Sequence, residues 1–348
     1  MSHEESRHVL MKSKRKKRKT KIILTTLFVS IFILIGVTVT YGYSTWNKAA
    51  NVVTDSYESD GRDAGSTLRE PEFELDEENI SILFIGVDQG GKREINDRGL
   101  SDALILATLN KHDKSVKMVN IPRDSYVYVP YRDEYTKITH AHAYGGTKAA
   151  IETVENLFEV PVDYYVTVNF NAFIDVVDTV GGIDVDVPFE MHELDSKDRK
   201  EAIHLLPGEQ TLDGEEALAF VRSRKYDNDI ERGNRQQEAL QALFKEALSF
   251  NSVLNINQLI DAVGQNMKTN IPFNQMVALS TEFISPKLSI ETLNLDGRDL
   301  ITDLYYFELD EAHLEEVKQE LSQHLEFQSS VAVKEDETDS PLDEVNGL

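Results

Sequence analysis

Residues 80–87 read ISILFIGV, a nearly continuous apolar run that ends at Asp88 and the pair Gly90–Gly91. A run of this length, bounded by a polar residue and glycines, is typical of a buried strand that leads into a loop. The stretch therefore predicts a strand inside the core of a sheet, with Asp88 at its carboxyl end.

On both sides of this run, apolar segments alternate with segments of helical periodicity. Further strands are predicted at residues 103–109, 116–121, 164–170, 183–187 and 290–295. Helices are predicted at residues 147–158, 171–180, 214–221, 236–250, 256–263 and 309–324. Alternating strands and helices indicate an α/β fold, and short turns between some strands indicate antiparallel pairs. We therefore expect a layered α/β/α domain with a mixed central sheet.

The N-terminus carries a topology signal. Nine of the first 21 residues are Lys or Arg, and 20 uncharged residues follow. That length crosses a bilayer as a helix, and the positive-inside rule keeps the basic residues 1–21 in the cytoplasm. We predict one transmembrane signal anchor at residues 22–43, and hence a single-pass type II protein of the cell membrane with an extracellular domain. A cleaved signal peptide is the alternative, but Tyr41, Tyr43 and Trp46 suit a membrane interface.

The rest of the chain divides by composition. We predict a linker at residues 44–79, the α/β domain at residues 80–327 and a disordered acidic tail at residues 328–348. The chain has no cysteine, which excludes disulfides, thiol catalysis and Cys metal sites. Of its 61 acidic residues only two lie within residues 1–21, so the remainder is strongly acidic and unsuited to nucleic acid.

Arginines gather in residues 222–235, RSRKYDNDIERGNR. The window contains Arg222, Arg224, Arg232 and Arg235. In an acidic chain such a cluster predicts an anion site, because guanidinium groups stay charged and donate paired hydrogen bonds to phosphate. The alternative is a solvated helix end whose arginines pair with the acidic residues of the same window.

Other polar residues lie where predicted strands begin or end. Asp88 follows the first strand, Asp102 precedes the second, and Arg123 follows the third. Ligands of open α/β sheets bind at strand ends, so Asp88 and Arg123 face one crevice if their strands are parallel. The two carboxylates are ligands of the kind that Mg²⁺ takes beside substrate phosphates. A turn cap is the plainer interpretation of each aspartate, and a surface ion pair that of Arg123.

Residues 137–146, KITHAHAYGG, place His140 and His142 two residues apart. This spacing occurs in metal sites, but no further Cys or His cluster lies nearby in the sequence. A backbone anion nest at Gly145–Gly146, opening a helix at Thr147, is the favoured interpretation. GxSxG, GxxxxGK[ST] and HExxH motifs are absent, which excludes the enzyme classes that they mark.

Taken together, these segments resemble the LytR–CpsA–Psr family of cell-envelope proteins. The resemblance is dense over residues 80–242, and in that family too a membrane anchor of this orientation precedes the domain. The segments that carry it are GVD (86–88), SDALILATLN (101–110), VKMVNIPRDSYV (116–127), KITHAHAYGG (137–146), VDYYVTVNF (162–170), VGGIDVDVPF (180–189), LDGEEALAFVRSR (212–224) and DIERGNRQQ (229–237).

The resemblance implies a phosphotransferase that moves an anionic glycopolymer, of teichoic acid or capsule type, from undecaprenyl pyrophosphate to a muramic acid hydroxyl of peptidoglycan. It also implies Mg²⁺, with Mn²⁺ as an alternative, held by Asp88 and Asp102. Pyrophosphate binding is expected of Arg98, Arg123, Arg222, Arg224, Arg232, Arg235 and Gln236. Catalysis is expected of Asp88, Arg123, Arg222, Arg224 and Asp229. Either Asp88 or Asp229 is the candidate base for the acceptor hydroxyl.

One position departs from the family pattern. Members often carry Arg immediately before the Ser-Asp pair, where this chain has Leu100. Arg98 replaces that contact if the loop lets it reach the phosphate, and otherwise one guanidinium contact is lost. The alternative function is a non-enzymatic envelope scaffold or regulator that binds polyprenyl pyrophosphate. A transcription regulator conflicts with the predicted topology and the lack of a helix-turn-helix signal.

Overall fold

The computed structural model describes residues 44–62, 65–69, 78–87, 99–223, 229–247, 261, 267–283 and 288–327. The chain divides into two compact units, residues 1–51 and 52–348. Residues 44–51, the described part of the first unit, are helical. Within the described ranges, no helix is both long enough and apolar enough to cross a membrane. The predicted anchor at residues 22–43 and the predicted tail at residues 328–348 lie outside those ranges.

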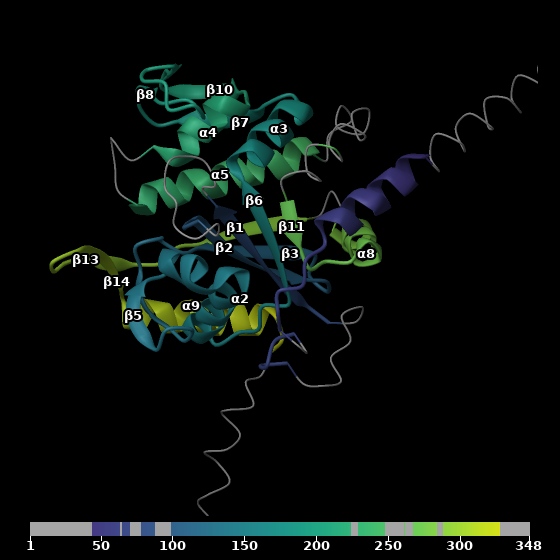
Figure 1. The fold of residues 1–348 in the computed structure, drawn as a ribbon, viewed down its shortest axis with the longest axis vertical. Coiled ribbons are helices and arrows are strands. Elements are labelled where there is room, and N and C mark those ends of the chain that lie inside the picture. Colours follow the sequence, from purple (N-terminus) through teal and green to yellow (C-terminus); the bar gives the residue numbers. More distant parts are fainter. Residues whose placement is uncertain are drawn as a thin grey trace, which may run out of the picture. The chain divides into compact units, whose positions relative to one another are not determined.

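A six-stranded sheet forms the centre of the second unit (Figure 1). Its strands are β1 (Ile80–Val87), β2 (Ser101–Asn110), β3 (Ser115–Asn120), β6 (Tyr164–Asn169), β11 (Met267–Thr269) and β12 (Ser289–Leu293). Their order is β11-β6-β1-β2-β3-β12. β6 is parallel to β1 and β12 to β3, whereas β2 is antiparallel to both β1 and β3, and β11 to β6. The sheet is therefore mixed, as predicted, and β1, β3, β6 and β12 share one direction.

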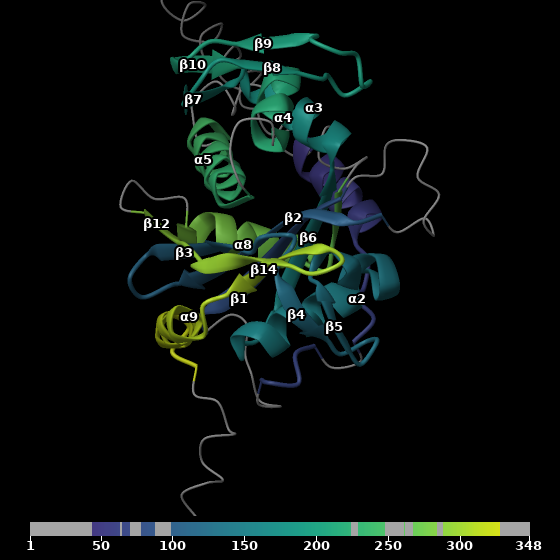
Figure 2. The same cartoon turned by 90° about the vertical axis from the view of Figure 1, so that its left-hand side faces the viewer.

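Helices cover both faces of this sheet (Figures 1 and 2). Helices α2 (Thr139–Phe158) and α9 (Glu311–His324) pack on one face, and α5 (Asp229–Ala247) and α8 (Phe273–Phe283) pack on the other. Helices α3 (Phe170–Val180) and α4 (Gly214–Arg222) pack on α5. Four two-stranded sheets complete the described fold: β4 (Tyr126–Val129) with β5 (Glu134–Lys137), β7 (Ile183–Val187) with β10 (Gly208–Leu212), β8 (Met191–Glu193) with β9 (Ile203–Leu205), and β13 (Gly297–Ile301) with β14 (Tyr305–Leu309).

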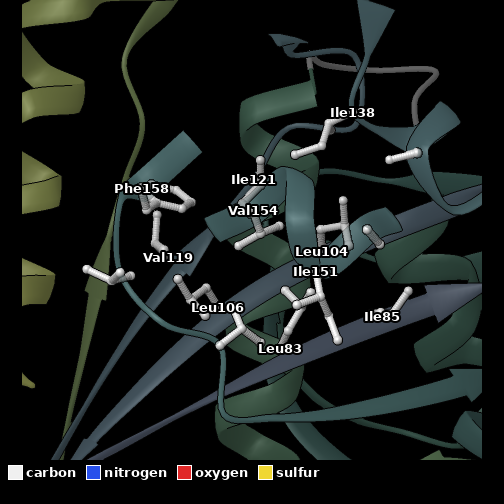
Figure 3. Close-up of a cluster of buried hydrophobic side chains, with 14 of the residues drawn as sticks. Leu83, Ile85, Leu104, Leu106, Val119, Ile121, Ile138, Ile151, Val154 and Phe158 are labelled. Carbon is white, nitrogen blue, oxygen red and sulfur yellow. The ribbon is translucent and has the colours of Figure 1, made fainter. Parts of the chain in front are cut away.

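The apolar run of β1 supplies side chains to both faces of the sheet. Leu83 and Ile85 belong to the core beneath α2 and α9, whereas Ile80 and Ile82 belong to the core beneath α5 and α8. Side chains of a strand point alternately to opposite faces, so a strand covered on both sides must be apolar throughout. Figure 3 shows the first of these cores, in which the β1 side chains meet those of β2 and of α2. The helices that cover both faces of the sheet explain why the sequence of β1 is apolar without interruption.

A second apolar cluster holds α3, α4 and α5 together with the small sheets β7–β10 and β8–β9. Side chains cap both of the shorter helices at their N-termini. Asn169 accepts a hydrogen bond from Ala172 N at the start of α3, and Asp213 forms a capping box with Glu216 at the start of α4. Such caps stabilise a helix by roughly 1 kcal/mol each and fix where it begins.

Several element boundaries differ from those predicted. The helix expected from residue 147 begins at Thr139, and Gly146, with φ of 70°, interrupts it. The strand expected to include Phe170 ends one residue earlier, because Asn169 caps α3. The predicted strand at residues 183–187 is present but pairs with β10 instead of joining the main sheet. Of the helix predicted at residues 256–263, the structure describes only residue 261.

Part of the predicted linker packs against the domain. Arg62 donates a hydrogen bond to Glu155 Oε1 at 2.9 Å and to the carbonyl of Val162 at 2.7 Å. Arg69 forms a salt bridge with Asp163 at 2.7 Å. Both arginines are largely buried, and hydrogen-bonded charged pairs of this kind resist separation. The segment that precedes β1 is therefore held at the base of the sheet.

A buried histidine fastens α9 to the sheet. The ring nitrogens of His324 lie 2.7 Å from Thr108 Oγ1 and 2.8 Å from Ser115 Oγ. Its carbonyl accepts a hydrogen bond from Asn110 Nδ2 at 2.8 Å. Burial lowers the pKa of His324, and the positive charge of Lys117 lowers it further.

We expect the stability of the protein to fall as the pH drops below about 6.5, the pKa of histidine in an unfolded chain. Below that pH the unfolded chain takes up a proton at His324 while the folded protein still excludes it, so acid favours unfolding. Urea titrations at pH 7.5 and 5.5 measure the change. A His324→Gln variant should lose part of this pH dependence, and an identical pH dependence in the variant would contradict the assignment.

Candidate functional site

The candidate site lies at one edge of the main sheet. β1, β3 and β6 end at this edge because they share a direction, and the antiparallel β2 begins there. β1 and β3 run in the same direction on either side of β2. This shared direction is the condition under which the sequence predicts that Asp88 and Arg123 face one crevice. Asp88 itself lies outside the described residues, directly after Val87. Binding at the carboxyl ends of strands is the general rule for such sheets.

A β-bulge places Asp102 at this edge. Val87 pairs with Ser101, but Gly86 pairs with Ala103, so Asp102 is an extra residue opposite β1. A bulge increases the local twist and redirects the side chain of the inserted residue. Asp102 therefore lies beside the end of β1, close to Val87. Val87 is the residue that precedes Asp88 in the sequence.

Arg123 and Asp102 form an ion pair at the edge. Arg123 Nη1 donates to Asp102 Oδ1, and the two side chains are 18% and 26% exposed. The loop that carries Arg123 is closed by a hydrogen bond from Ser125 N to Pro122 O at 2.9 Å. Thr139 N, at the start of α2, also donates to the Arg123 carbonyl at 3.2 Å. The guanidinium is thus held in place while part of it stays open to an incoming anion.

Four buried side-chain atoms of the described residues that lack a hydrogen-bond partner belong to this pair or to the segments beside it: Ser101 Oγ, Asn120 Oδ1, Arg123 Nε and Ser125 Oγ. Others lie elsewhere, among them Thr167 Oγ1 and both polar side-chain atoms of Gln237. Nearly all buried polar atoms are satisfied in folded proteins, so such a group indicates a place completed by ligand or ordered water. Sequence reasoning missed the two serines and Asn120, although each adjoins a predicted residue or a strand end.

Arg222 lies over the carboxyl end of β6. Its guanidinium carbon is 4.8 Å from the ring centroid of Phe170, the residue that follows β6 and begins α3. Arg222 is the last residue of α4, where a cation also interacts favourably with the helix dipole. Stacking on the aromatic face restricts the side chain. A second guanidinium is therefore positioned at the strand edge that carries Arg123.

The N-terminal part of α5 approaches β3 at a glycine. A Cβ atom added to Gly233 would overlap Asn120 Nδ2, the side-chain amide at the end of β3. Only glycine permits backbone and side chain to come this close at a helix surface. The Arg-rich start of α5 is consequently packed directly against the segment that leads to Arg123.

Two of the predicted binding residues join α5 to α4. Arg235 donates from Nε to the Phe220 carbonyl at 3.0 Å and from Nη2 to the Ser223 carbonyl at 2.7 Å. Gln236 Nε2 donates to the Val221 carbonyl at 3.3 Å. The last carbonyls of a helix have no partner within it, so these bonds complete the C-terminus of α4. Arg235 is 3% exposed, and these described contacts are structural.

The remaining predicted residues are placed less completely. Arg232 is buried in α5, three residues before Arg235 and hence on a similar side of the helix. Asp229 is the first residue of α5, but its side chain is not described. Arg98 and Arg224 lie outside the described residues. Their roles stay predictions.

His140 and His142 have separate partners. His140 Nδ1 lies 2.8 Å from Thr136 Oγ1, and His142 Nδ1 lies 3.1 Å from the Gly99 carbonyl. Burial lowers the pKa of His140, and the charges of Lys137 and Arg123 lower it further. The one group of three possible metal ligands found among the described residues contains neither of them. It consists of Glu190, His192 and His204, exposed around the β8–β9 hairpin.

The glycine pair of the same segment has a packing role. A Cβ atom on Gly145 would lie 2.5 Å from Ala149 Cβ and 2.8 Å from the Tyr131 ring. Gly146 interrupts α2 with non-helical backbone angles. The interruption brings a new helical segment to Thr147, where the sequence predicted a helix start. The anion nest proposed for these glycines stays a prediction.

Known proteins are similar to this chain in sequence and in fold. A model of the LytR_cpsA_psr family matches residues 41–323. The polyisoprenyl-teichoic acid–peptidoglycan teichoic acid transferase TagT of Bacillus subtilis (strain 168) is 38% identical over 324 residues, covering 92% of this chain and 99% of that protein. TagV of the same organism is 36% identical over 317 residues, covering 88% of this chain and 79% of that protein.

A solved structure of TagT bound to LI-WTA is 40% identical, covers 76% of this chain and 98% of that one, and has a TM-score of 0.66. A structure of the LytR-CPS2A-psr family protein YwtF (TagT) with bound octaprenyl pyrophosphate lipid is 37% identical, with coverages of 76% and 98% and a TM-score of 0.62.

The contact between Gly233 and Asn120 is expected to set the position of α5. A Gly233→Ala variant should be destabilised by roughly 1–3 kcal/mol, because the added methyl group overfills a packed contact. Chemical denaturation measures the effect.

The double variant Gly233→Ala with Asn120→Ala removes the obstructing amide and provides the control. It should regain much of the lost stability, because alanine is the better helix former by about 1 kcal/mol once the overlap is gone. A Gly233→Ala protein as stable as the wild type would show that α5 does not depend on this contact.

Proposed function

This chain belongs to the LytR–CpsA–Psr family, and we propose that it transfers an anionic glycopolymer, of teichoic acid or capsule type, from undecaprenyl pyrophosphate to peptidoglycan. The relatives named above are teichoic acid transferases that act on polyisoprenyl-linked teichoic acid and peptidoglycan. One structural relative holds octaprenyl pyrophosphate. The similarity extends over 99% of the length of TagT, so the comparison is with the whole of that transferase and not with one part of it.

One observation carries the proposal: separate elements bring guanidinium groups to a single sheet edge. Arg123 follows β3, Arg222 ends α4 above the end of β6, and Asp102 stands between the ends of the strands. Three buried donors without a partner, Ser101 Oγ, Arg123 Nε and Ser125 Oγ, lie in the same segments. A doubly phosphorylated headgroup has the charge and the hydrogen-bond acceptors that these donors and the guanidinium groups need.

The proposed reaction is a substitution at phosphorus. The acceptor hydroxyl of peptidoglycan attacks the phosphorus atom that bears the polymer, and the bond from that phosphorus to the bridging oxygen breaks. Undecaprenyl phosphate leaves, and the hydroxyl proton passes to a carboxylate, for which Asp88 and Asp229 are the candidates. Arg123 and Arg222 hold the phosphate oxygens and neutralise their charge, which is the main contribution that a protein makes to such reactions.

We propose that Asp88 and Asp102 hold a Mg²⁺ ion, with Mn²⁺ as the alternative. The donor set fits a hard cation, because Asp102 is a partly exposed carboxylate on a bulge beside the strand that leads to Asp88. When bound, the ion would neutralise pyrophosphate charge and orient its oxygens. The Arg98 side chain is the candidate to replace the arginine that the family pattern places at Leu100.

The proposed location follows from the sequence. Residues 1–21 are basic and residues 22–41 are uncharged, as expected of a type II anchor that leaves the α/β domain outside the cell. A lipid-linked donor would then meet the domain at the membrane surface. The partly buried apolar side chains at the margin of the cluster shared by α3, α4 and α5 are candidates for contact with the prenyl chain, since the cluster adjoins the end of α4 that carries Arg222. They include Phe173, Val221 and Leu243.

Removal of the Arg222 side chain tests the enzymatic role. We expect Arg222→Ala to lower the rate of transfer by about 10³-fold, because the charge that stabilises the phosphate oxygens is lost. Arg222→Lys should fall between this variant and the wild type, since it keeps the charge but loses the planar stack on Phe170. The assay is polymer transfer by the full chain in liposomes, with a lipid-linked donor and a peptidoglycan acceptor.

Lys268→Ala, which removes an exposed cation paired with Glu58, is the matched control and should transfer normally. Wild-type protein that binds the lipid with Mg²⁺ present and yet transfers no polymer would favour a non-enzymatic scaffold. Full activity of Arg222→Ala would refute the role given to that residue.

Metal dependence provides a separate test. Chelation by EDTA should abolish transfer, and added Mg²⁺ should restore it. In Asp102→Asn the Mg²⁺ concentration for half-maximal activity should rise about tenfold or more, because an amide is a weaker ligand than a carboxylate. Asp296→Asn, which alters an exposed carboxylate elsewhere, should match the wild type. Undiminished activity after EDTA treatment would rule out the metal requirement.

A further inference from the structure

The outward face of the β4–β5 hairpin is built from tyrosines. Tyr128 pairs with Tyr135 across the hairpin, and Tyr126 pairs with Lys137, so all four side chains share one face. The Tyr135 ring centroid lies 5.6 Å from that of Tyr126 and 5.4 Å from that of Tyr128. The alternate residues Val127 and Val129 are buried in the main core. The hairpin therefore anchors itself by its valines and presents its tyrosines.

The neighbouring hairpin extends this face. Ser125 forms a β-bridge with Phe307 of β14, and Phe307 N donates to the Asp124 carbonyl at 2.8 Å. Figure 2 shows β14 beside β4 and β5. Tyr306 of β14 packs edge-on against Tyr126, with ring centroids 4.9 Å apart. We call the combined face the tyrosine surface; it consists of Tyr126, Tyr128, Tyr135, Tyr305 and Tyr306.

Its exposure distinguishes this surface from a core. Tyr135 is 62% exposed, Tyr126 39% and Tyr305 37%. Tyrosines that served only to pack the hairpins would be covered, as Val127 is. Clustered aromatic rings that stay open to water are characteristic of binding surfaces, where the ring supplies apolar contact and the hydroxyl supplies a polar one.

The tyrosine surface adjoins the proposed reaction site. Tyr126 is three residues after Arg123, so the two Cα atoms are at most about 11 Å apart. Asp124 lies between them and connects both regions, because its Oδ1 accepts a hydrogen bond from Lys137 Nζ at 2.7 Å. A molecule that rests on the tyrosines can therefore extend to the phosphates held at Arg123.

The charges on this surface are paired with polar partners and disfavour an anionic occupant. The lone lysine of the face, Lys137, is paired with Asp124, and its Nζ lies 5.6 Å and 5.7 Å from the ring centroids of Tyr305 and Tyr306. Tyr128 donates its hydroxyl to Asp133 at 2.5 Å, and Tyr305 donates to Asp299 at 2.9 Å. Carboxylates at its margin would repel a polymer rich in phosphate, and the pyrophosphate has its own guanidinium groups. Uncharged sugar rings fit better, because their C–H faces pack on aromatic rings while their hydroxyls reach the polar groups.

We propose that the tyrosine surface binds the glycan strand of the acceptor peptidoglycan and directs its hydroxyl toward the donor phosphate. This inference rests on the proposed transferase function and adds the place of the acceptor. The donor and the acceptor would then occupy adjoining surfaces of opposite character, one lined by arginines and the other by tyrosines.

Binding of uncrosslinked glycan strands, free of lipid and pyrophosphate, tests the inference on the full chain in detergent. Tyr135→Ala and Tyr126→Ala should each weaken glycan binding about three- to tenfold, the loss expected for one aromatic contact. The KM for the acceptor should rise by the same factor, whereas kcat and the affinity for octaprenyl pyrophosphate should change less than about twofold. Calorimetry and steady-state kinetics give these values.

Two controls separate ring contact from folding. Tyr135→Phe keeps the ring and should bind glycan nearly as the wild type does. Tyr57→Ala removes an exposed tyrosine next to β11, at one edge of the main sheet, and should have no effect on glycan binding. Thermal unfolding of each variant confirms that the fold is retained.

The outcomes are distinct. Unchanged glycan binding in both alanine variants, or no glycan binding by the wild type, would overturn the proposal. So would a loss of pyrophosphate affinity alone, or a dimer in light scattering that the alanine variants dissociate. Wild-type protein that binds glycan through these tyrosines but transfers no polymer would leave this inference standing and refute the transferase function.

Discussion

The shared direction of β1, β3 and β6 is the constraint on which the site depends. It sends three chain segments out of the sheet at one edge, so residues distant in the sequence meet there without a dedicated pocket-forming domain. Like charges brought together in this way repel one another, and the fold offsets that repulsion with a different partner for each arginine. Asp102 faces Arg123, the Phe170 ring faces Arg222, and helix carbonyls face Arg235. The guanidinium groups are consequently ordered before any ligand arrives, which lowers the entropy lost on binding.

The same arrangement gives α5 a structural role at the candidate site. Burial of a guanidinium without partners costs several kcal/mol, so the buried Arg235 depends on partners such as the two carbonyls that accept its N–H groups. Hydrogen bonds to charged groups each contribute roughly 1.5–3 kcal/mol, enough to offset much of that cost. The close approach at Gly233 fixes the other side of the helix against β3. α5 therefore links the position of Arg222 to that of Arg123, although neither residue belongs to it.

The sequence was sufficient for the parts of the fold that depend on local pattern. The apolar run of β1 predicted a doubly covered strand, and the alternation of strands and helices predicted a mixed sheet between helical layers. The position of Asp102 on a bulge was not predictable, because a bulge depends on the register between two strands and not on either strand alone. Arg235 looked equivalent to its neighbours in the window, since nothing in a one-dimensional pattern reveals which arginine meets the end of another helix. The hairpins β4–β5 and β13–β14 were missed because their short strands do not alternate apolar and charged residues as the equally short β7 does.

Under the two proposals, the segment from Ile121 to Tyr126 would serve two substrates of opposite character. Its first half leaves β3 and carries Arg123, whereas its second half enters β4 and begins the tyrosine surface. Asp124 lies between the two and pairs with Lys137, whose Nζ lies 5.6 Å and 5.7 Å from the ring centroids of Tyr305 and Tyr306. In a protein whose acidic residues far outnumber its basic ones, arginines along the strand edge would favour the binding of a polyanionic donor there. The sugar rings of a glycan carry no charge themselves and would be retained by ring contact instead. Separation of the two modes of recognition within six residues would let donor and acceptor bind side by side without competing for the same groups.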